Sequence, residues 1–259
     1  MDEGLANALL LSLGLVVGFL GTIIGVGGGF IVGPTLLTFY KMSPGEVAGT
    51  SLVVVFLNAL SGTLAYLQQR RVVVRTGVVM SAITIPGSVL GSLLTSYIGG
   101  GPFRVFFAAL LTLAAIRMMR GARGAGTARE TDSLGRNGSR QAAMLVPLSL
   151  LSGVISGFFG VGGGIIHVPV MVLMLGFPAH IATATSQFVL TFTSITGLAT
   201  HAQLGNINPG LTLPVGLGAL VGAQLGARFS RRLSSRNLEL AFSFFLLAMS
   251  VNLLYQALV

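Results

Sequence analysis

Long apolar runs alternate along the chain with short polar or glycine-containing breaks. The runs show no strict period of two, so they predict α-helices rather than strands. A helix needs about 20 apolar residues to cross a bilayer, and two of the runs, Phe30–Tyr40 and Ile165–Phe177, are so short that they predict half-helices. The other predicted helices are Gly4–Ile24, Val47–Leu67, Thr76–Ile98, Phe103–Met119, Ala142–Phe159, Ile181–Ala202, Asn208–Ala227 and Asn237–Leu258.

The sequence matches itself without gaps at a shift of 135 residues. The matches fall on Gly, Pro, Thr and Ser rather than on Leu or Val, whose abundance alone would create matches. They therefore indicate two copies of one membrane unit. The matching features are the GVGGG segments Gly25–Gly29 and Gly160–Gly164, the prolines Pro34 and Pro169, and the pairs Thr50-Ser51 and Thr185-Ser186.

Between the two copies lies a segment rich in Gly, Arg, Ser and Thr that has no apolar period. Such a composition is typical of a flexible connector. We therefore expect a first membrane repeat over residues 1–120, a cytoplasmic linker over residues 121–141, and a second membrane repeat over residues 142–259.

Composition and charge placement support a membrane protein. The chain is 53% hydrophobic and only 8% charged, whereas a soluble domain carries about a quarter charged residues. The net charge of +9 comes from arginine clusters that bound apolar spans, which is the positive-inside pattern and not a nucleic-acid-binding face. We expect these clusters to lie in the cytoplasm, with the protein in the inner membrane. They are Arg70 to Arg75, Arg117 to Arg140 and Arg228 to Arg236.

The arginine clusters also predict how the two copies are oriented. The third cluster follows the fourth predicted segment of the second copy, whereas the matching loop of the first copy, residues 98–102, falls on the opposite side of the membrane. Each copy then crosses an odd net number of times. The expected fold is an all-α polytopic membrane protein made of two inverted repeats, each broken at a glycine-rich turn, a construction typical of secondary transporters.

The two GVGGG turns are the candidate binding elements. Glycines allow positive φ and close approach of the backbone to a ligand, and the N-terminus of the following half-helix offers free N–H groups to an anion. The alternative is that these glycines only permit tight helix packing. The candidate amides are those of Gly27, Gly28, Gly29, Gly162, Gly163 and Gly164.

Polar side chains near the turns could complete an anion site. The hydroxyls of Thr50, Ser51, Thr185 and Ser186 can either cap helices or donate to an oxyanion. Gln187 adds a donor, or else a hydrogen bond between helices. His167, three residues after the second turn, could respond to the protonation state of a substrate, or be an ordinary packed histidine.

The positions of the acidic residues and the absence of cysteine argue against several other functions. None of the six acidic residues lies in the middle of a span, which argues against a cation transporter and an intramembrane protease. The chain has no cysteine, and no histidine pair has metal-ligand spacing. We therefore expect no catalytic residues, no metal and no cofactor. The remaining partners are the lipid bilayer and a small anion.

The duplicated glycine turns, the following prolines and the Thr-Ser pairs resemble those of the TauE/SafE family of sulfite and organosulfonate exporters, also called toluene-sulfonate uptake permeases. The resemblance covers nearly the whole chain outside the linker. It implies secondary transport of sulfite or small organosulfonates, with export favoured. The alternatives are an anion channel, an uptake permease for another small anion, and a membrane enzyme or scaffold without transport. The oligomeric state stays open.

Overall fold

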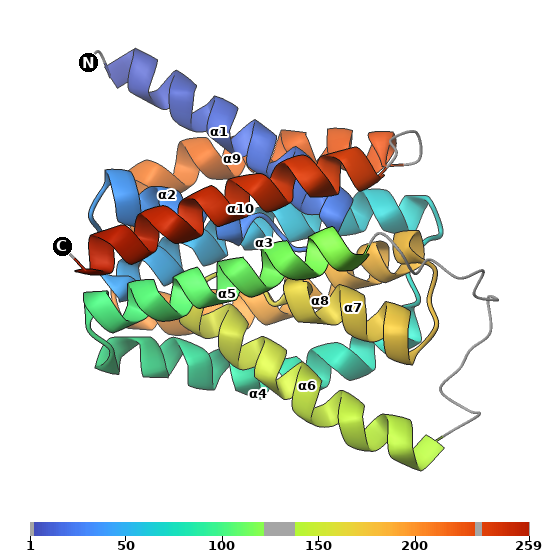
Figure 1. Ribbon diagram of the computed structural model, residues 1–259. Coiled ribbons are helices and arrows are strands. Elements are labelled where there is room, and N and C mark those ends of the chain that lie inside the picture. The colour runs from blue at the N-terminus through green and yellow to red at the C-terminus, as the bar shows by residue number, and fades with distance from the viewer. Residues whose placement is uncertain (1–2, 122–137, 231–234, 259) are drawn as a thin grey trace.

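The computed structural model describes residues 3–121, 138–230 and 235–258. Within these ranges the chain forms ten α-helices, one short 3-10 helix and no strand. Figure 1 shows the helices lying side by side. They are α1 (Glu3–Ile24), α2 (Gly29–Phe39), α3 (Pro44–Gln68), α4 (Val74–Leu94), η1 (Thr95–Tyr97), α5 (Gly100–Gly121), α6 (Gly138–Phe159), α7 (Gly164–Met174), α8 (Ala179–Gln203), α9 (Pro209–Phe229) and α10 (Ser235–Leu258).

The helix ends follow from local chemistry. Ser43 and Glu46 form a reciprocal capping box at the start of α3, with Pro44 at its first position. The short helices α2 and α7 have Gly28 and Gly163 as their N-cap residues, and the φ angles of 79° and 73° there favour glycine. The sequence-based end of the second half-helix is corrected, because α7 stops at Met174.

A left-handed glycine explains why α7 ends three residues earlier than the apolar run. Gly176 has a φ of 67°, and the N–H of Phe177 turns back to the carbonyl of Met171 at 3.0 Å. This arrangement closes a helix end. Phe177 is nevertheless buried, so its apolar character reflects packing of the loop and not continuation of the helix.

Several helices are long and apolar enough to span a bilayer. Among the described residues there are five such stretches: Gly4–Ile24, Pro44–Gln68, Val74–Tyr97, Gly100–Arg117 and Pro209–Phe229. Large apolar side chains are exposed on the outer faces of these helices, for example Leu113 and Leu213. Such surfaces require a lipid environment, so the chain is a polytopic membrane protein.

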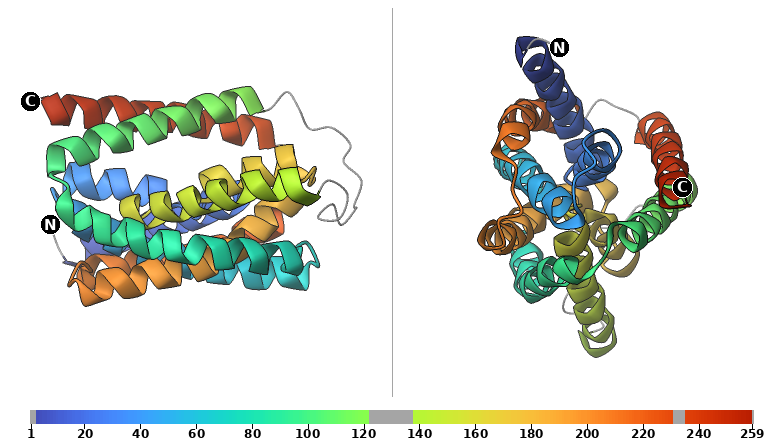
Figure 2. Two further views of the ribbon diagram at one scale, coloured as in Figure 1. Left: turned by 90° about the horizontal axis from the view of Figure 1, so that it is seen from below. Right: turned by 90° about the vertical axis from the view of Figure 1, so that its left-hand side faces the viewer.

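The helices of the two halves pack on one another reciprocally. At the centre α3 packs against its counterpart α8. The helix α1 packs against α9, and the counterparts of these two helices, α6 and α4, pack against each other in the same way. The α5/α10 pair stands at one side of the bundle, as the end-on view in Figure 2 shows. The long helices α1, α3, α4 and α5 of the first half therefore contact mainly helices of the second.

Glycines hold the paired helices close together. In the α1/α9 pair, a Cβ added at Gly222 would overlap the carbonyl oxygen of Leu15. In the α4/α6 pair, a Cβ added at Gly91 would overlap the carbonyl oxygen of Val154. Small residues that let helix backbones approach are typical of membrane bundles. These glycines outside the GVGGG turns therefore serve packing.

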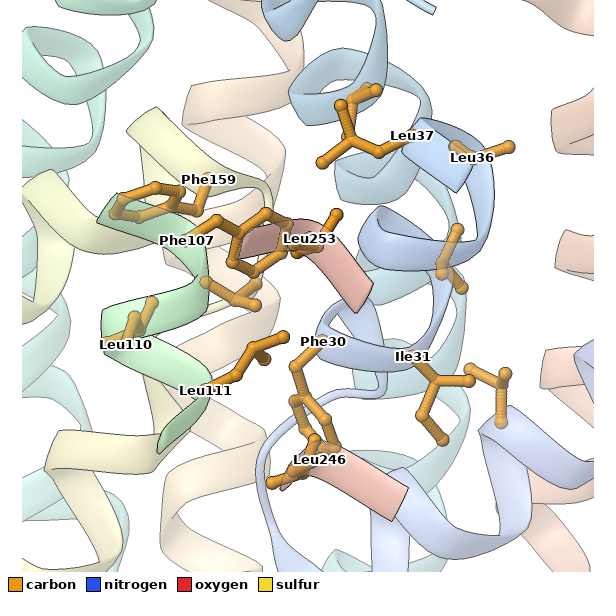
Figure 3. Close-up of a cluster of buried hydrophobic side chains, with 14 of the residues drawn as sticks. Phe30, Ile31, Leu36, Leu37, Phe107, Leu110, Leu111, Phe159, Leu246 and Leu253 are labelled. Carbon is orange, nitrogen blue, oxygen red and sulfur yellow. The ribbon is translucent and has the colours of Figure 1, made fainter. Parts of the chain in front are cut away.

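An apolar cluster covers α2 much more completely than the corresponding helix α7. Figure 3 shows Phe30 and Leu37 of α2 lying among side chains of α5 and α10, including Phe107 and Leu246. In α7, by contrast, Ile165, Ile166, Val168 and Pro169 are all partly exposed, although their counterparts 30, 31, 33 and 34 are buried. The two half-helices thus lie in different surroundings.

The loops after α3 and α8 reach into the opposite half. Arg71 is buried, donates to Ser230 Oγ at 2.8 Å and to the carbonyl of His180 at 3.4 Å, and its guanidinium lies 5.0 Å from the ring of Tyr66. Asn206, 135 residues later, packs on Gly45 and bonds His201 Nδ1 at 3.3 Å. Each loop therefore joins the two halves at one end of the bundle.

Candidate functional site

The two glycine turns lie in contact with each other inside the bundle. A Cβ added at Gly29 would overlap the carbonyl oxygen of Gly160, and one added at Gly164 would overlap the carbonyl oxygen of Gly25. All ten residues of the two GVGGG segments are buried. The repeated motif thus forms one junction between the halves, at which only glycine allows the backbones to approach.

The turns leave several backbone N–H groups without an acceptor. In the first turn, the Gly21 carbonyl accepts from the N–H groups of Gly25 and Val26, both at 3.0 Å, and from Gly27 at 3.3 Å. Six other turn amides donate to no group in the described part of the chain. They are the amides of Gly28, Gly29, Val161, Gly162, Gly163 and Gly164. Because buried N–H groups are normally paired, this cluster of donors marks a site that suits an anion.

Two equivalent apolar side chains cover both turns. A Cβ added at Gly27 would lie 3.0 Å from Val55 Cγ1 and 3.2 Å from Leu190 Cδ1. A Cβ added at Gly162 would lie 2.7 Å from Val55 Cγ1 and 3.2 Å from Leu190 Cδ2. Val55 in α3 and Leu190 in α8 are 135 positions apart, so each half supplies one of them. We call them the Val55/Leu190 pair.

The threonines of the Thr-Ser pairs connect the two halves. Thr50 Oγ1 accepts from the N–H of Asn208, the N-cap of α9, at 3.2 Å. Thr185 Oγ1 accepts from the N–H of Val73, the N-cap of α4, at 3.1 Å. Neither threonine caps its own helix. Each serves as acceptor to a helix start in the opposite half, and its own O–H can still donate.

The serines of these pairs lie against the opposite glycine turn. Ser186 Oγ donates to the carbonyl of Gly25 at 2.7 Å. Ser51 is equally buried, and its Cβ lies 3.0 Å from a Cβ placed at Gly160, but its hydroxyl has no partner among the described residues. Ser186 therefore supports the first turn, whereas the Ser51 hydroxyl remains available as a donor to a ligand.

Gln187 belongs to a polar network beside the first turn. Its Nε2 donates to the Gly21 carbonyl at 2.9 Å. In the same region Thr22 Oγ1 donates to Asn58 Oδ1 at 2.7 Å, and Tyr66 Oη donates to the Thr22 carbonyl at 3.0 Å. Gln187 thus bonds from α8 to α1, and Asn58 bonds from α3 to α1.

A second polar group surrounds the other turn. His167 is completely buried, and neither ring nitrogen has a partner among the described residues. The same holds for the hydroxyls of Ser149 and Ser156 in α6. Between these two serines, Ser152 Oγ donates to the Gly163 carbonyl at 2.7 Å. The sequence argument did not single out the three serines, although their spacing of three and four residues places them on one face of a helix.

A surface hollow of about 430 Å³ lies away from the turns, between α5 and α6. It contains none of the candidate anion-binding residues, and its lining is wholly apolar, so it suits hydrocarbon rather than an anion. Over the described residues no group of His, Asp or Glu could hold a metal ion. The hollow is lined by Leu94, Phe106, Ala109, Leu110, Leu113, Val154, Ile155, Phe158 and Phe159.

Comparison with known proteins agrees with the membrane fold. The chain is 29% identical over 265 residues to the probable membrane transporter protein YunE of Bacillus subtilis, covering 96% of this chain and 97% of that protein. It is 30% identical over 234 residues to a probable membrane transporter protein of Haemophilus influenzae, covering 88% and 87%. No solved structure matches significantly. Residues 10–253 match the profile of the sulfite exporter TauE/SafE, and the chain therefore belongs to the TauE/SafE family of membrane proteins.

Proposed function

We propose that this protein is a secondary transporter that exports sulfite or a small organosulfonate by alternating access, without enzymatic activity. The observation that carries the proposal is the set of six buried N–H groups, unpaired among the described residues, where the two glycine turns meet. Such amides stabilise negative charge without a buried cation. The family and its relatives, named sulfite exporter and probable membrane transporters, support the substrate class and the transport role.

The arrangement of the halves supports two inverted membrane repeats, residues 1–120 and 142–259. In Figure 1, α5 runs from left to right and its counterpart α10 from right to left, while α2 and α7 lie toward opposite ends. Arg71 of the first basic cluster contacts Ser230, beside Arg228 of the third. A shared end for these clusters fits a cytoplasmic location in the inner membrane. The part of the linker at residues 122–137 lies outside the described residues.

In this proposal the substrate binds where the two turns meet. The amides of both turns hold the oxyanion, and the hydroxyls of Thr50, Ser51 and Thr185 face it as further donors. Ser186 and Gln187 support the first turn without contacting the substrate, because their side chains donate to the carbonyls of Gly25 and Gly21. The Val55/Leu190 pair covers the turns, so we assign this structure to a closed state, and rocking of one half against the other must move the pair aside.

Flux measurements test the transport function. Purified protein in liposomes should move radiolabelled sulfite in a saturable manner, and unlabelled sulfite on the far side should accelerate that movement. A channel using the same amides would give flux without trans-stimulation. Sulfate, thiosulfate and methanesulfonate serve as competing anions. Liposomes that carry none of these anions faster than protein-free liposomes would contradict the proposal.

Alanine substitution of the covered glycines tests the site. In Gly162→Ala the new methyl group would press on Val55 Cγ1 at 2.7 Å, above the turn amides, and sulfite flux should fall at least about ten-fold, which corresponds to about 1.4 kcal/mol. Gly205→Ala is the matched control, because Gly205 has a similar positive φ of 72° but nothing within 4 Å. Equal flux in the two variants would remove the turns from the site.

A further inference from the structure

We propose that the anion binds off the centre of the junction, on the second turn, and that His167 and Ser156 are its side-chain ligands. This inference rests on the proposed function and specifies which half supplies the side chains. A half-helix N-terminus alone would not identify a site. Here it coincides with two fully buried side chains whose polar atoms have no partner in the described part of the chain.

The difference between the halves is a difference of sequence at equivalent positions. Where the second half has Ser156 and His167, the first half has Gly21 and Val32. Gly21 and Val32 are buried and provide no side-chain donor or acceptor. A site with equal contributions from both halves would need polar groups in both places, so the polar side chains point to binding at the second turn.

Helix geometry directs His167 toward the turn. Its own N–H donates to the Gly163 carbonyl at 3.3 Å, and the same carbonyl accepts from Ser152 Oγ at 2.7 Å. Side chains in a helix lean toward its N-terminus, which for α7 is the glycine turn. The Ser156 carbonyl accepts from the N–H of Gly160 at 2.9 Å, so α6 reaches the same turn. Ser152 and Ser156 of α6 therefore bond the second turn directly, and His167 lies in the first turn of the helix that follows it.

The polar groups near the first turn are mostly bonded to one another. Thr22 donates to Asn58, and Gln187 donates to the Gly21 carbonyl. These bonds leave Asn58 Nδ2 and Gln187 Oε1 without a partner among the described residues. Three side chains held in this way support the fold around the first turn. In contrast, both ring nitrogens of His167 lack a partner among the described residues. A neutral imidazole can donate one N–H to an anion, and its other nitrogen can accept from the O–H of a protonated oxyanion.

Access also favours the second turn. The helix that follows it, α7, is partly exposed at Ile165, Ile166, Val168 and Pro169, whereas α2 is buried under α5 and α10 at the equivalent positions (Figure 3). Less packing must be displaced before a solute reaches the second turn. The unpaired side chains, the turn amides and the looser packing therefore coincide in the second half.

The decisive variant is His167→Val, which gives the second half the residue that the first half has at Val32. Sulfite should bind about ten-fold or more weakly, because a hydrogen bond to a charged ligand is lost. The melting temperature without ligand should stay equal or rise, because two unpaired buried polar atoms are removed. Purified full-length protein is measured by thermal shift over a sodium sulfite series, with sodium chloride at matched ionic strength.

His201→Val is the matched control, because His201 is buried but bonded to the Gly157 carbonyl at 3.0 Å and to Asn206. It should lower the melting temperature and leave sulfite affinity unchanged. If His167→Val does not fold, the Ser156→Ala variant decides, with the same expected loss of affinity. Wild-type affinity in the deciding variant overturns this inference but leaves the proposed function standing if wild-type flux is present. Absence of binding and flux in the wild type overturns both.

Discussion

Equivalent serines in the two halves have different tasks. Ser186 Oγ donates to the carbonyl of Gly25 and so fixes the first turn, whereas the hydroxyl of Ser51, beside Gly160, has no acceptor among the described residues. Both side chains are fully buried. The difference shows that the repeated Thr-Ser motif does not give both copies the same hydrogen bonds, and it has a measurable consequence for stability.

Ser186→Ala should lower the free energy of unfolding by about 0.5–1.5 kcal/mol, because a buried hydrogen bond is lost and the Gly25 carbonyl loses a donor. Ser51→Ala should be neutral or slightly stabilising, since its hydroxyl is buried without a partner. Both substitutions remove one oxygen atom, so each serves as the control for the other. Thermal unfolding in one detergent compares them, and equal effects would contradict the assignment of the Ser186 bond.

At the scale of elements, two helix pairs depend on backbone contact. The α1/α9 and α4/α6 pairs place glycines against carbonyl oxygens of the facing helix, as at Gly222 and Leu15. In lipid, close packing replaces much of the hydrophobic driving force that holds soluble helices together. The spacing of these glycines therefore sets how closely the halves approach.

Gly222→Ala should cost about 1–3 kcal/mol of stability, because its methyl group would overlap the Leu15 carbonyl and push α1 from α9. Gly4→Ala provides a control, since Gly4 lies in α1, the helix that packs on α9, but has nothing within 4 Å. Alanine favours helix more than glycine does, so Gly4→Ala should not destabilise. Melting temperatures of the purified variants make the comparison, and an unaffected Gly222→Ala protein would contradict the packing.

At the scale of the whole molecule, the near-symmetry breaks where the loops join the halves. Arg71 lies beside Tyr66 and Ser230 at one end, whereas its counterpart Asn206 lies beside His201. A guanidinium at one end and an amide at the other distinguish the two ends by charge. This difference agrees with a single orientation in the membrane, set by basic residues.

Cysteine labelling tests the inversion directly, because the chain has no cysteine of its own. Gln68 and Gln203 are exposed, uncharged and 135 residues apart, at the C-terminal ends of α3 and α8. In inverted repeats, Gln203→Cys should react with a membrane-impermeant maleimide in intact cells, and Gln68→Cys only after permeabilisation. Each variant is the control for the other, and labelling of both from one side would exclude inversion.

Most of the fold could be predicted from local sequence. The expected half-helix Phe30–Tyr40 appears as Gly29–Phe39, because the start is set by glycine conformation and the length by the apolar run. The apolar run predicts too late an end for the other half-helix, α7, since Phe177 belongs to a buried loop after Gly176. For the candidate site, the sequence pointed to the turns and to His167 but not to Ser149, Ser156 or Val55, which look like ordinary members of apolar helices.

By itself the sequence determined the membrane class, the ten helices and the two glycine turns, because apolar length, glycine freedom and charge placement are local properties of the chain. Only the tertiary structure decided that the turns touch each other, that the Val55/Leu190 pair covers them, and that Ser186 bonds a carbonyl 161 residues away. Those contacts depend on how one half packs against the other, and no local pattern specifies which groups such packing brings within hydrogen-bond distance.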